Sequence, residues 1–185
     1  MDTLTAIHTR FSVPKVGPAP VPRALVEALL WAAVQAPNHY RVRPWRFVVL
    51  SGDARQRLGE VMAQSFSQKF PKSPPEVLDK ERAKPLRSPL LIAVGVDEPS
   101  DPRVIEIENI CAAAAACQNL LLAAHDLGLA AQWRTGDAVR DPLVKDFLGF
   151  EPAQQVIAFL YIGFPEHGPA PYERPGFEEH TVWME

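Results

Sequence analysis

Cations, hydroxyl groups and aromatic rings gather in three short stretches of the sequence. These stretches are TRFS at residues 9–12, APNHYRVRPWRF at residues 36–47 and QWRTG at residues 132–136. An arginine near a serine offers a phosphate charge-assisted hydrogen bonds, and tryptophan and histidine offer flat rings to a planar ligand. An ordinary turn needs only residues such as Gly, Asn or Pro for its backbone angles. Together the stretches predict a site for a planar, anionic ligand.

Each stretch also has a structural interpretation. Arg10 follows the first predicted helix, where a cation commonly faces the negative end of the helix dipole. Trp45 taken alone fits core packing, and His39 taken alone fits a surface or structural role. Arg134 follows an apolar segment, so we expect it to be buried or half-buried and to need a partner. That partner is either an acidic residue of the C-terminal half or a phosphate of the ligand.

Hydrophobic periodicity predicts the elements that position these stretches. Helices are expected near residues 2–9, 22–33, 53–66, 76–84, 104–127 and 141–149, and strands near 46–52, 89–97, 130–136 and 154–165. Helices outnumber strands and do not alternate with them, so the predicted fold class is α+β, a central sheet wrapped by helices. No GxGxxG follows a strand, which argues against a Rossmann nucleotide site, and the sequence has no Walker, HExxH or GxSxG pattern.

Length and composition favour one soluble domain. The chain has 185 residues, of which 47% are apolar, enough to bury one continuous core. MDTLTAIHTRF has no apolar segment of the signal-peptide type, so we expect a cytoplasmic protein. Polar residues interrupt the longest apolar run, at 111–131, which argues against a membrane span. Cys111 and Cys117 have neither the spacing of a redox pair nor that of a zinc knuckle, so both are expected to be buried free thiols.

The net charge of −3 conceals two halves of opposite sign. Residues 1–96 carry a net charge of +7, and residues 97–185 carry −10. The basic half can attract a phosphate, and the acidic half can pair with it in the same chain or in a partner chain. Nucleic acid is the weaker interpretation, because the basic residues are scattered and the whole protein is acidic.

Two segments lie outside the predicted core. Residues 67–89 are rich in Lys, Pro and Ser, and they form either a mobile lid or a solvated surface excursion. Residues 165–185 have too many Pro and Gly for a helix, yet they contain Phe177 and Trp183. A solvated tail gains nothing from aromatic rings, so we expect the C-terminal tail to pack on something.

The order and spacing of these stretches resemble the FMN-dependent nitroreductase family, especially its small single-domain bacterial branch. The resemblance covers nearly the whole chain: the Arg-Ser element near the start, APNHYRVRPWRF at the family's AP(S/D)xxxxQPW stretch, the Ala-rich helix, WRTG, and FLYIGFPE as the last core strand. The chain departs from the family pattern at Phe11, where a second arginine is usual, at Arg43, where Gln is usual, and at Arg41, where many members have Asn. These departures affect the groups around the flavin ring rather than the fold.

The resemblance implies one nitroreductase-like domain over residues 1–185, with a central mixed or antiparallel sheet, in an intertwined homodimer. Two FMN sites would lie at the subunit interface, and the tail, 165–185, would pack on the partner. Arg134 would pair with the phosphate, and Gln35 and His39 would come from the other subunit. The cofactor-binding residues implied are Arg10, Phe11, Ser12, Gln35, His39, Trp133, Arg134 and Thr135.

The same resemblance implies an enzyme that passes a hydride from NADH or NADPH to FMN and then to a nitroaromatic or quinone-like acceptor. The cofactor carries the chemistry, so neither a catalytic side chain nor a metal is expected. Glu108 faces either the flavin pocket or solvent. The residues implied to contact the nicotinamide donor are Ala123, Ala124, His125, Asp126, Leu127 and Gly128.

Two alternatives remain open from the sequence. The first is a flavoprotein whose natural acceptor is not a nitro compound, because an open site accepts many planar oxidants. The second is a non-catalytic flavin or nucleic-acid binding module that uses Arg41, Arg43 and Arg46 with Trp45.

Overall fold

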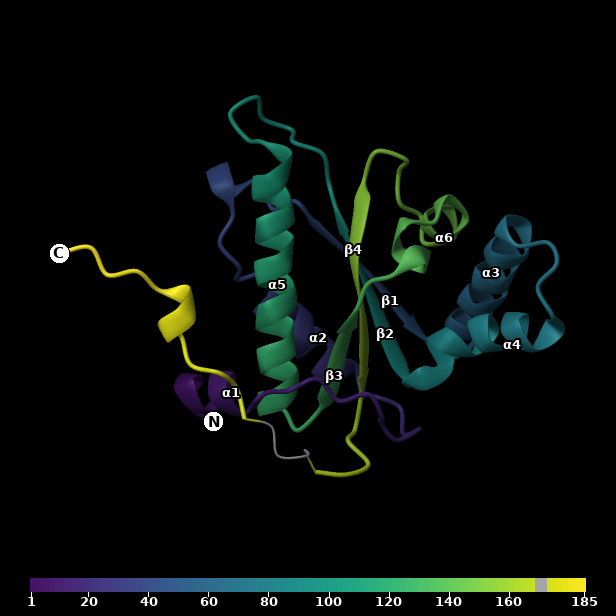
Figure 1. The fold of residues 1–185 in the computed structure, drawn as a ribbon, viewed down its shortest axis with the longest axis horizontal. Coiled ribbons are helices and arrows are strands. Elements are labelled where there is room, and N and C mark those ends of the chain that lie inside the picture. Colours follow the sequence, from purple (N-terminus) through teal and green to yellow (C-terminus); the bar gives the residue numbers. More distant parts are fainter. Residues whose placement is uncertain (169–172) are drawn as a thin grey trace.

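The fold is built around a four-stranded antiparallel sheet (Figure 1). The computed structural model describes residues 1–168 and 173–185. The strands, in their order across the sheet, are β1 (Trp45–Ser51), β2 (Leu90–Val96), β4 (Gln155–Gly163) and β3 (Ala130–Arg134). Each neighbouring pair runs antiparallel. The predicted α+β class is confirmed, and the sheet, expected to be mixed or antiparallel, is antiparallel.

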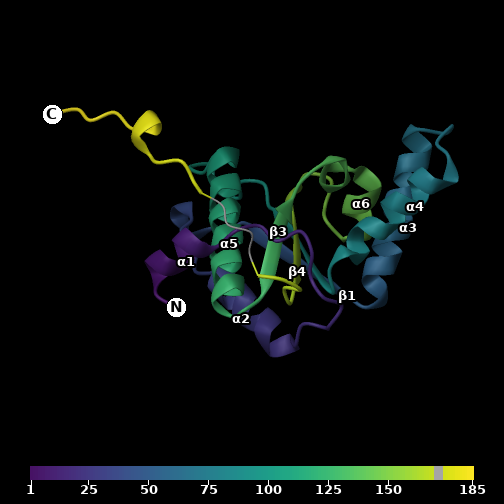
Figure 2. The same ribbon diagram turned by 60° about the horizontal axis from the view of Figure 1, so that its bottom comes forward.

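Helices cover both faces of the sheet (Figures 1 and 2). The two layers are α2 (Arg23–Ala33) with α5 (Glu106–Asp126), and α3 (Asp53–Lys69) with α6 (Pro142–Phe147). Side chains alternate along a strand, so Ile92 and Leu160 pack in the α2–α5 layer while Leu91 and Tyr161 pack in the α3–α6 layer. β2 is buried along its whole length, as its unbroken apolar sequence predicts.

α5 is the central helix of the molecule. Its alanines at 112, 113 and 116 are buried, and these small side chains let the sheet and α2 approach closely. By length and composition α5 is also able to cross a membrane, and 44% of its most apolar window is buried inside the fold. Its place in the core accounts for its apolar composition. Gly128 follows the helix with φ of 73°, the left-handed conformation expected of a C-terminal cap.

The N-terminal segment covers the free edge of β3. Asp2 caps α1 (Thr3–Thr9) by accepting a hydrogen bond from the Thr5 amide at 3.0 Å. Beyond α1, the Val13 amide donates to the Ala131 carbonyl at 3.2 Å, and Val16 forms an isolated bridge with Pro165. This path brings the TRFS stretch beside the β3 stretch, although the two are 120 residues or more apart in sequence.

Residues 67–89 contain a helix that packs on α3. α4 (Pro75–Ala83) approaches so closely that a Cβ on Gly59 would lie 2.3 Å from the Arg82 carbonyl oxygen. Arg82 also donates to Glu60 of α3 and to Asp79, each at 2.8 Å. Residues 75–83 are therefore a helix packed against α3, and both the lid and the surface interpretation of residues 67–89 stay predictions.

The two cysteines lie in different environments. Cys117 is fully buried, and burial raises its pKa to about 12. Cys111 is exposed, so the expectation that both thiols are buried is wrong for Cys111. Six residues on an α-helix correspond to a rotation of about 240°, so the two thiols point to different sides of α5.

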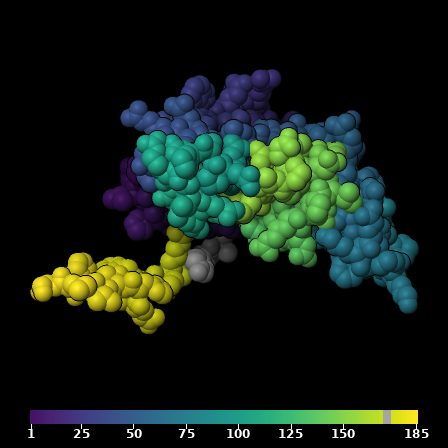
Figure 3. Space-filling view, turned by 90° about the horizontal axis from the view of Figure 1, so that it is seen from above, coloured from purple at the N-terminus to yellow at the C-terminus, as the bar shows by residue number. Residues whose placement is uncertain are grey.

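The last residues stand away from the body of the molecule (Figures 1 and 3). They include a single helical turn, η4 (Glu178–His180). Phe177 is 61% exposed and Trp183 is 78% exposed, so the described residues leave most of the surface of these side chains uncovered. Residues 169–172, within the predicted tail of 165–185, lie outside the described residues.

Candidate functional site

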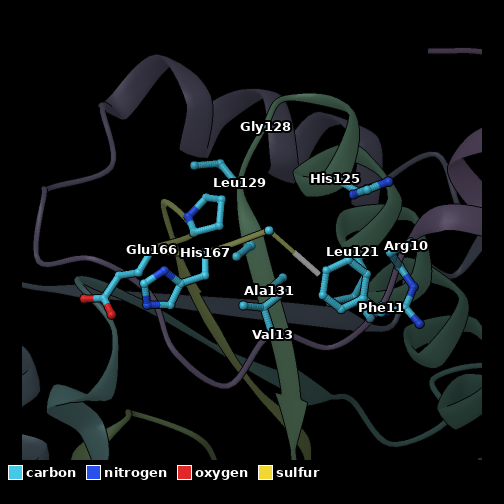
Figure 4. Close-up of a pocket in the computed structure, with 13 residues that line it drawn as sticks. Arg10, Phe11, Val13, Leu121, His125, Gly128, Leu129, Ala131, Glu166 and His167 are labelled. Carbon is cyan, nitrogen blue, oxygen red and sulfur yellow. The ribbon is translucent and has the colours of Figure 1, made fainter. Parts of the chain in front are cut away.

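A pocket of about 340 Å³ lies where α5 ends and β3 begins (Figure 4). Figure 4 shows Arg10, Phe11 and His125 at one end of this pocket and Glu166 and His167 at the other. A second hollow of about 800 Å³ shares Arg10, Phe11 and His167 with it and adds Ser12. We call the two together the Arg10 pocket. Its other lining residues include Val13, Pro14, Lys15, Leu121, Gly128, Leu129, Ala130, Ala131, Arg174 and Pro175.

Two guanidinium groups that pair with no carboxylate of the described residues meet at the Arg10 pocket. Arg174 donates to the carbonyl oxygens of Ile7 and Arg10, which fixes it beside the N-terminal segment. Burial lowers the pKa of Arg10, and the charge of Arg174 lowers it further. Within residues 1–168 and 173–185, neither arginine forms an ion pair. Because like charges repel, an anion bound between the two groups would stabilise this arrangement.

The C-terminal end of α5 is tied to α1. The Thr9 hydroxyl lies 2.8 Å from His125 Nε2. The N-terminal ammonium of Met1 forms an ion pair with Asp126 at 2.7 Å, and this carboxylate raises the pKa of the ammonium. Asp126 is therefore occupied by an interaction within the chain, whereas His125 lines the Arg10 pocket.

His39 lies at the other end of α5. Its Nδ1 is 2.8 Å from Glu108 Oε1, and this contact lowers the pKa of Glu108. The two residues line a shallow apolar hollow of about 440 Å³ together with the exposed Cys111. We call this the His39 hollow. Glu108, whose role the sequence left open, thus positions His39.

The loop that carries His39 has an unusual backbone. Tyr40, Arg41 and Arg43 have positive φ angles of 46°, 57° and 51°, which side chains other than glycine rarely adopt. The Asn38 side chain accepts a hydrogen bond from the Arg43 amide at 2.9 Å and closes the loop. Such strain persists only where surrounding contacts enforce it, and it is common at functional sites.

Those contacts form a clamp on Tyr40. The Tyr40 ring stacks on His39 with ring centroids 4.4 Å apart, and the Arg103 guanidinium carbon lies 3.9 Å from the Tyr40 centroid. Arg103 in turn makes two hydrogen bonds to Asp101, and these lower the pKa of Asp101 to about 2. Arg103 and Asp101, in the segment before α5, therefore hold the Tyr40 ring beside His39.

The Arg10 pocket and the His39 hollow lie too far apart to form one site within a single chain. Glu108 contacts His39 and His125 lines the Arg10 pocket, and both belong to α5. A rise of 1.5 Å per residue separates these two helix positions by about 25 Å. Gln35, on the C-terminal side of α2, is exposed and donates to the Trp31 carbonyl at 3.3 Å.

The WRT residues divide between two faces of the sheet. Trp133 packs in the α2–α5 layer, where its Nε1 donates to the Ile157 carbonyl at 3.3 Å. Arg134 points into the opposite layer, in a pocket of about 420 Å³ that Thr135 also lines. This pocket shares no lining residue with the Arg10 pocket. We call it the basic pocket, because its charged lining residues are Lys69, Lys84, Arg87, Arg134 and Arg140 against Glu81, Asp137 and Asp141.

The structure therefore gathers only part of the predicted set in the Arg10 pocket: Arg10, Phe11, Ser12, His125 and Gly128. Ala124 is fully buried in the core, and Ala123 packs against that core. Leu127 is exposed at the end of α5. Sequence reasoning missed Arg174, although a lone arginine in an acidic tail is a visible signal. It also missed Tyr40 and Arg103, for which no local signal exists, because Arg103 reaches Tyr40 only through the fold.

Trp45 and its neighbouring arginines do not form a stacking surface. Trp45 is only 6% exposed and packs in the core. Arg46 pairs with Asp97 at 2.5 Å. The ring needed by the nucleic-acid binding alternative is thus inaccessible.

Comparison with known proteins places this chain in one family. The model described as the nitroreductase family matches residues 7–164. YdjA of Escherichia coli K12, named as a candidate NAD(P)H nitroreductase, is 30% identical over 167 residues, which are 90% of each chain. The chain belongs to the nitroreductase family, and it is an oxidoreductase.

Solved structures agree with this placement. A nitroreductase-like family protein of Bacillus cereus is 28% identical, with a TM-score of 0.86 over 100% of this chain and 97% of the other. A candidate nitroreductase of Desulfovibrio desulfuricans, solved in complex with FMN, is 25% identical, with a TM-score of 0.75 over 98% and 96% of the two chains. The predicted family and its fold are therefore confirmed.

Proposed function

We propose that this oxidoreductase binds FMN and uses NADH or NADPH to reduce nitroaromatic or quinone-like acceptors. The observation that carries the proposal is the pair Arg10 and Arg174, two neighbouring guanidinium groups at a pocket beside α5 that pair with no carboxylate of residues 1–168 and 173–185. The name of the Escherichia coli relative supports the nicotinamide donor. The Desulfovibrio desulfuricans structure supports FMN. A cytoplasmic location stays a prediction.

The residues of the Arg10 pocket fit the phosphate of FMN. The Arg10 guanidinium is partly buried and donates no hydrogen bond within the described chain, so its donors are free for an anion. Arg174 adds a second positive charge. The Ser12 hydroxyl lies on the same lining and offers a further hydrogen bond. Phe11 and the adjoining β3 edge offer the apolar surface that a planar ring requires.

A second copy of the chain completes this site in the proposal. Two chains related by a two-fold axis that pairs their α5 helices antiparallel bring the His39 hollow of one chain to the Arg10 pocket of the other. In this arrangement exposed apolar side chains of α5 and α2 would be buried between the two chains: Ile107 is 56% exposed and Trp31 is 71% exposed. Gln35, one turn from Trp31, then lies near the shared cofactor, as the family resemblance implies.

The C-terminal tail belongs to the same proposal. Its aromatic rings are uncovered in one chain, and Arg174 anchors its start at the N-terminal segment. Covering Phe177 and Trp183 on the partner would bury the apolar surface that a single chain leaves in water. One domain over residues 1–185, with the tail of 165–185 on the partner, is the arrangement that we propose.

FMN, when bound, supplies the two-electron hydride chemistry. The chain binds and orients FMN and keeps water away from it. In the proposal Arg10, Arg174 and Ser12 hold the anionic end of FMN, and Phe11 lies beside the ring. The contact of Arg103 with the Tyr40 ring holds the strained loop around His39 in one conformation. In the proposal this conformation fixes the partner's His39 beside the flavin ring. The end of α5, from Ala123 to Gly128, borders the space for the nicotinamide donor.

Two measurements on the purified protein test this function. We expect a yellow protein with the absorption bands of oxidised flavin and the solution mass of two chains. It should consume NADH or NADPH when a nitroarene or a quinone is added. A mass equal to one chain, with no bound chromophore after incubation in excess FMN, contradicts the proposal. A yellow dimer that reduces quinones but no nitroarene supports the flavoprotein with a non-nitro acceptor.

A further inference from the structure

An exposed histidine is held in one orientation at the start of α5. The His39 side chain is 47% exposed, and its Nδ1 lies 2.8 Å from Glu108 Oε1. Its ring also stacks on Tyr40, which the Arg103 guanidinium covers. An exposed side chain ordinarily samples several rotamers, and burial does not offset the entropy cost of ordering this one. The fixed orientation of the ring therefore points to a role in binding.

Glu108 is itself held by the backbone of its own helix. Its Oε2 accepts a hydrogen bond from the Ile105 amide at 3.1 Å, in the manner of a capping box, and its Oε1 faces His39 Nδ1. The contact with His39 and the hydrogen bond from Ile105 both lower the pKa of Glu108. The carboxylate is therefore ionised at neutral pH. Because an ionised carboxylate only accepts hydrogen bonds, the hydrogen between the two side chains lies on His39 Nδ1.

This contact decides which hydrogen-bonding group the other ring nitrogen offers. A neutral imidazole with its hydrogen on Nδ1 keeps a lone pair on Nε2, so Nε2 is an acceptor. The hydrogen bond made by one ring nitrogen thus sets the state of the other. The two nitrogens point in divergent directions, so Nε2 is turned away from Glu108. His39 therefore offers an oriented acceptor to a molecule outside its own chain.

The surroundings of this acceptor are mostly apolar. The His39 hollow is lined by His39, Glu108, Cys111 and Asn38 together with Pro37, Ile107, Ala112 and Ala115. In the dimer that we propose, this hollow faces the partner's Arg10 pocket and the FMN bound there. FMN carries hydrogen-bond donors of two kinds that suit a lone pair, the hydroxyl groups of its ribityl chain and the N3–H group of its ring.

We propose that Glu108 is a positioning residue for flavin binding. It fixes the hydrogen of His39 on Nδ1, so that Nε2 accepts a hydrogen bond from the FMN held by the partner subunit. The inference rests on the proposed function and adds to it the group that sets the tautomer of His39. With the hydrogen on Nε2 instead, the ring would present a donor to the donors of FMN, and this hydrogen bond would be lost.

Nitrogen NMR of the imidazole rings measures this tautomer directly. The full-length protein, labelled with nitrogen-15, is recorded with and without FMN at about pH 8, where an ordinary imidazole is neutral. The signals of His39 are assigned by their absence in His39→Ala. We expect the hydrogen on Nδ1 in the unmodified protein and in Glu108→Gln, because glutamine keeps an acceptor oxygen. Glu108→Ala should shift His39 towards the tautomer with its hydrogen on Nε2.

Fluorescence titration with FMN measures what the tautomer contributes to binding. Glu108→Ala should weaken FMN about 3- to 10-fold, the size of one lost hydrogen bond. Glu108→Gln should recover most of this loss, although it removes the same charge. In a chain that already carries His39→Ala, Glu108→Ala should cause no further loss of FMN affinity, because Glu108 acts through His39.

A matched control and a modified flavin complete the test. Glu106→Ala removes an acidic residue from the same helical turn, one that contacts Gln155 rather than His39. It should leave both the tautomer and the FMN affinity unchanged. FMN methylated at N3 distinguishes the two kinds of donor. If Glu108→Ala weakens FMN but not N3-methyl FMN, the donor is N3–H, and an equal loss with both assigns a ribityl hydroxyl.

Three results overturn this inference while leaving the proposed function intact. One is a hydrogen on Nε2 of His39 in the unmodified protein. Another is unchanged FMN affinity in Glu108→Ala. The third is a loss that persists in the His39→Ala chain, which would assign Glu108 to the stability of α5 alone. An unmodified protein that binds no FMN would instead overturn the proposed function and the inference with it. Unfolding midpoints within about 2 °C of the unmodified protein confirm that each variant is folded for these comparisons.

Discussion

The Arg10 pocket and the basic pocket use the same residue type in two different ways. Both lie at the edge of the sheet near β3 and contain arginines that form no ion pair with any residue the structure describes. In the proposed dimer the Arg10 pocket is completed by His39 of the partner subunit, because the His39 of the same chain lies at the far end of α5. The basic pocket draws all of its groups from one chain. The sequence alone does not distinguish these two cases, because only the fold shows which groups of one chain lie together.

The residues that support the two pockets differ as well. The basic pocket rests on Asp141, which is buried and caps α6. The Arg10 pocket rests on the N-terminal segment and on the tail residue Arg174, which hold each other through exposed backbone contacts. We therefore expect the basic pocket to be rigid in one chain and the Arg10 pocket to depend on assembly.

The largest expected effect comes from breaking the frame of the basic pocket. Asp141→Ala removes the α6 cap and leaves Lys69 and Ser65 without their shared acceptor. Loss of a buried pair and of a cap should lower the free energy of unfolding by about 3 kcal/mol, as measured by urea denaturation. The control is Asp146→Ala on the exposed side of the same helix, with an expected change within about 0.5 kcal/mol. A similar small change in both variants would mean that Asp141 is not part of the frame.

Asp141 also makes stability depend on pH. Burial acts to raise its pKa, but hydrogen bonds from Lys69 and Ser65 outweigh burial, and the net pKa lies below the ordinary value of 3.8. A depressed carboxyl pKa contributes stability that is present above 3.8 and is lost as pH falls through the folded-state value. The stability difference between the unmodified protein and Asp141→Asn should therefore shrink below pH 3.8. A constant difference down to pH 2 would contradict this.

The second prediction asks which arginine holds the flavin. Arg10→Gln should weaken FMN about 10- to 100-fold, because a charged donor to the phosphate is lost. Arg134→Gln should change FMN affinity by less than about three-fold, since its side chain lies across the sheet. Fluorescence titration of the flavin-free protein measures both. An equal loss of FMN affinity in the two variants would support the prediction from sequence, in which Arg134 binds the flavin phosphate.

Strand alternation explains why the sequence prediction for Arg134 is incomplete. The motif WRTG identifies a family element, but it does not say which face of the sheet each side chain occupies. Trp133 and Arg134 are adjacent, so a strand sends them to opposite faces. The alternation was visible in the sequence, and applying it would have separated the two residues. The buried β2, the Asp141 cap and the Gly128 cap were all predictable, because each depends on local sequence.

Other features were beyond local sequence. The contact between Arg174 and the Arg10 carbonyl joins residues 164 positions apart. The positive φ angles of Tyr40, Arg41 and Arg43 occur in residues that ordinarily avoid them. They depend on contacts from Arg103 and Asn38, which the fold brings near. The sequence therefore predicted the helices and strands, whereas the contacts between distant residues required the structure.

The third prediction tests sharing between chains by mixing subunits. A dimer of one Arg10→Gln chain and one His39→Ala chain should hold one unchanged flavin site and one doubly altered site. Isolated by two affinity tags, it should bind one FMN per dimer with the affinity of the unmodified protein, half of the full stoichiometry. Two equal, weakened sites would contradict the shared site.

The smallest expected effect concerns the Tyr40 clamp. Arg103→Ala removes the cation from the Tyr40 ring and leaves the strained loop held by Asn38 and the His39 stack. We expect faster hydrogen exchange at residues 38–43 and flavin binding about two- to three-fold weaker, because His39 is less well positioned for the partner. Arg82→Ala, which removes exposed ion pairs between α3 and α4, is the matched control. If both variants weaken flavin equally, His39 contributes only through general stability, and the contrast between a shared site and a single-chain pocket loses its structural basis.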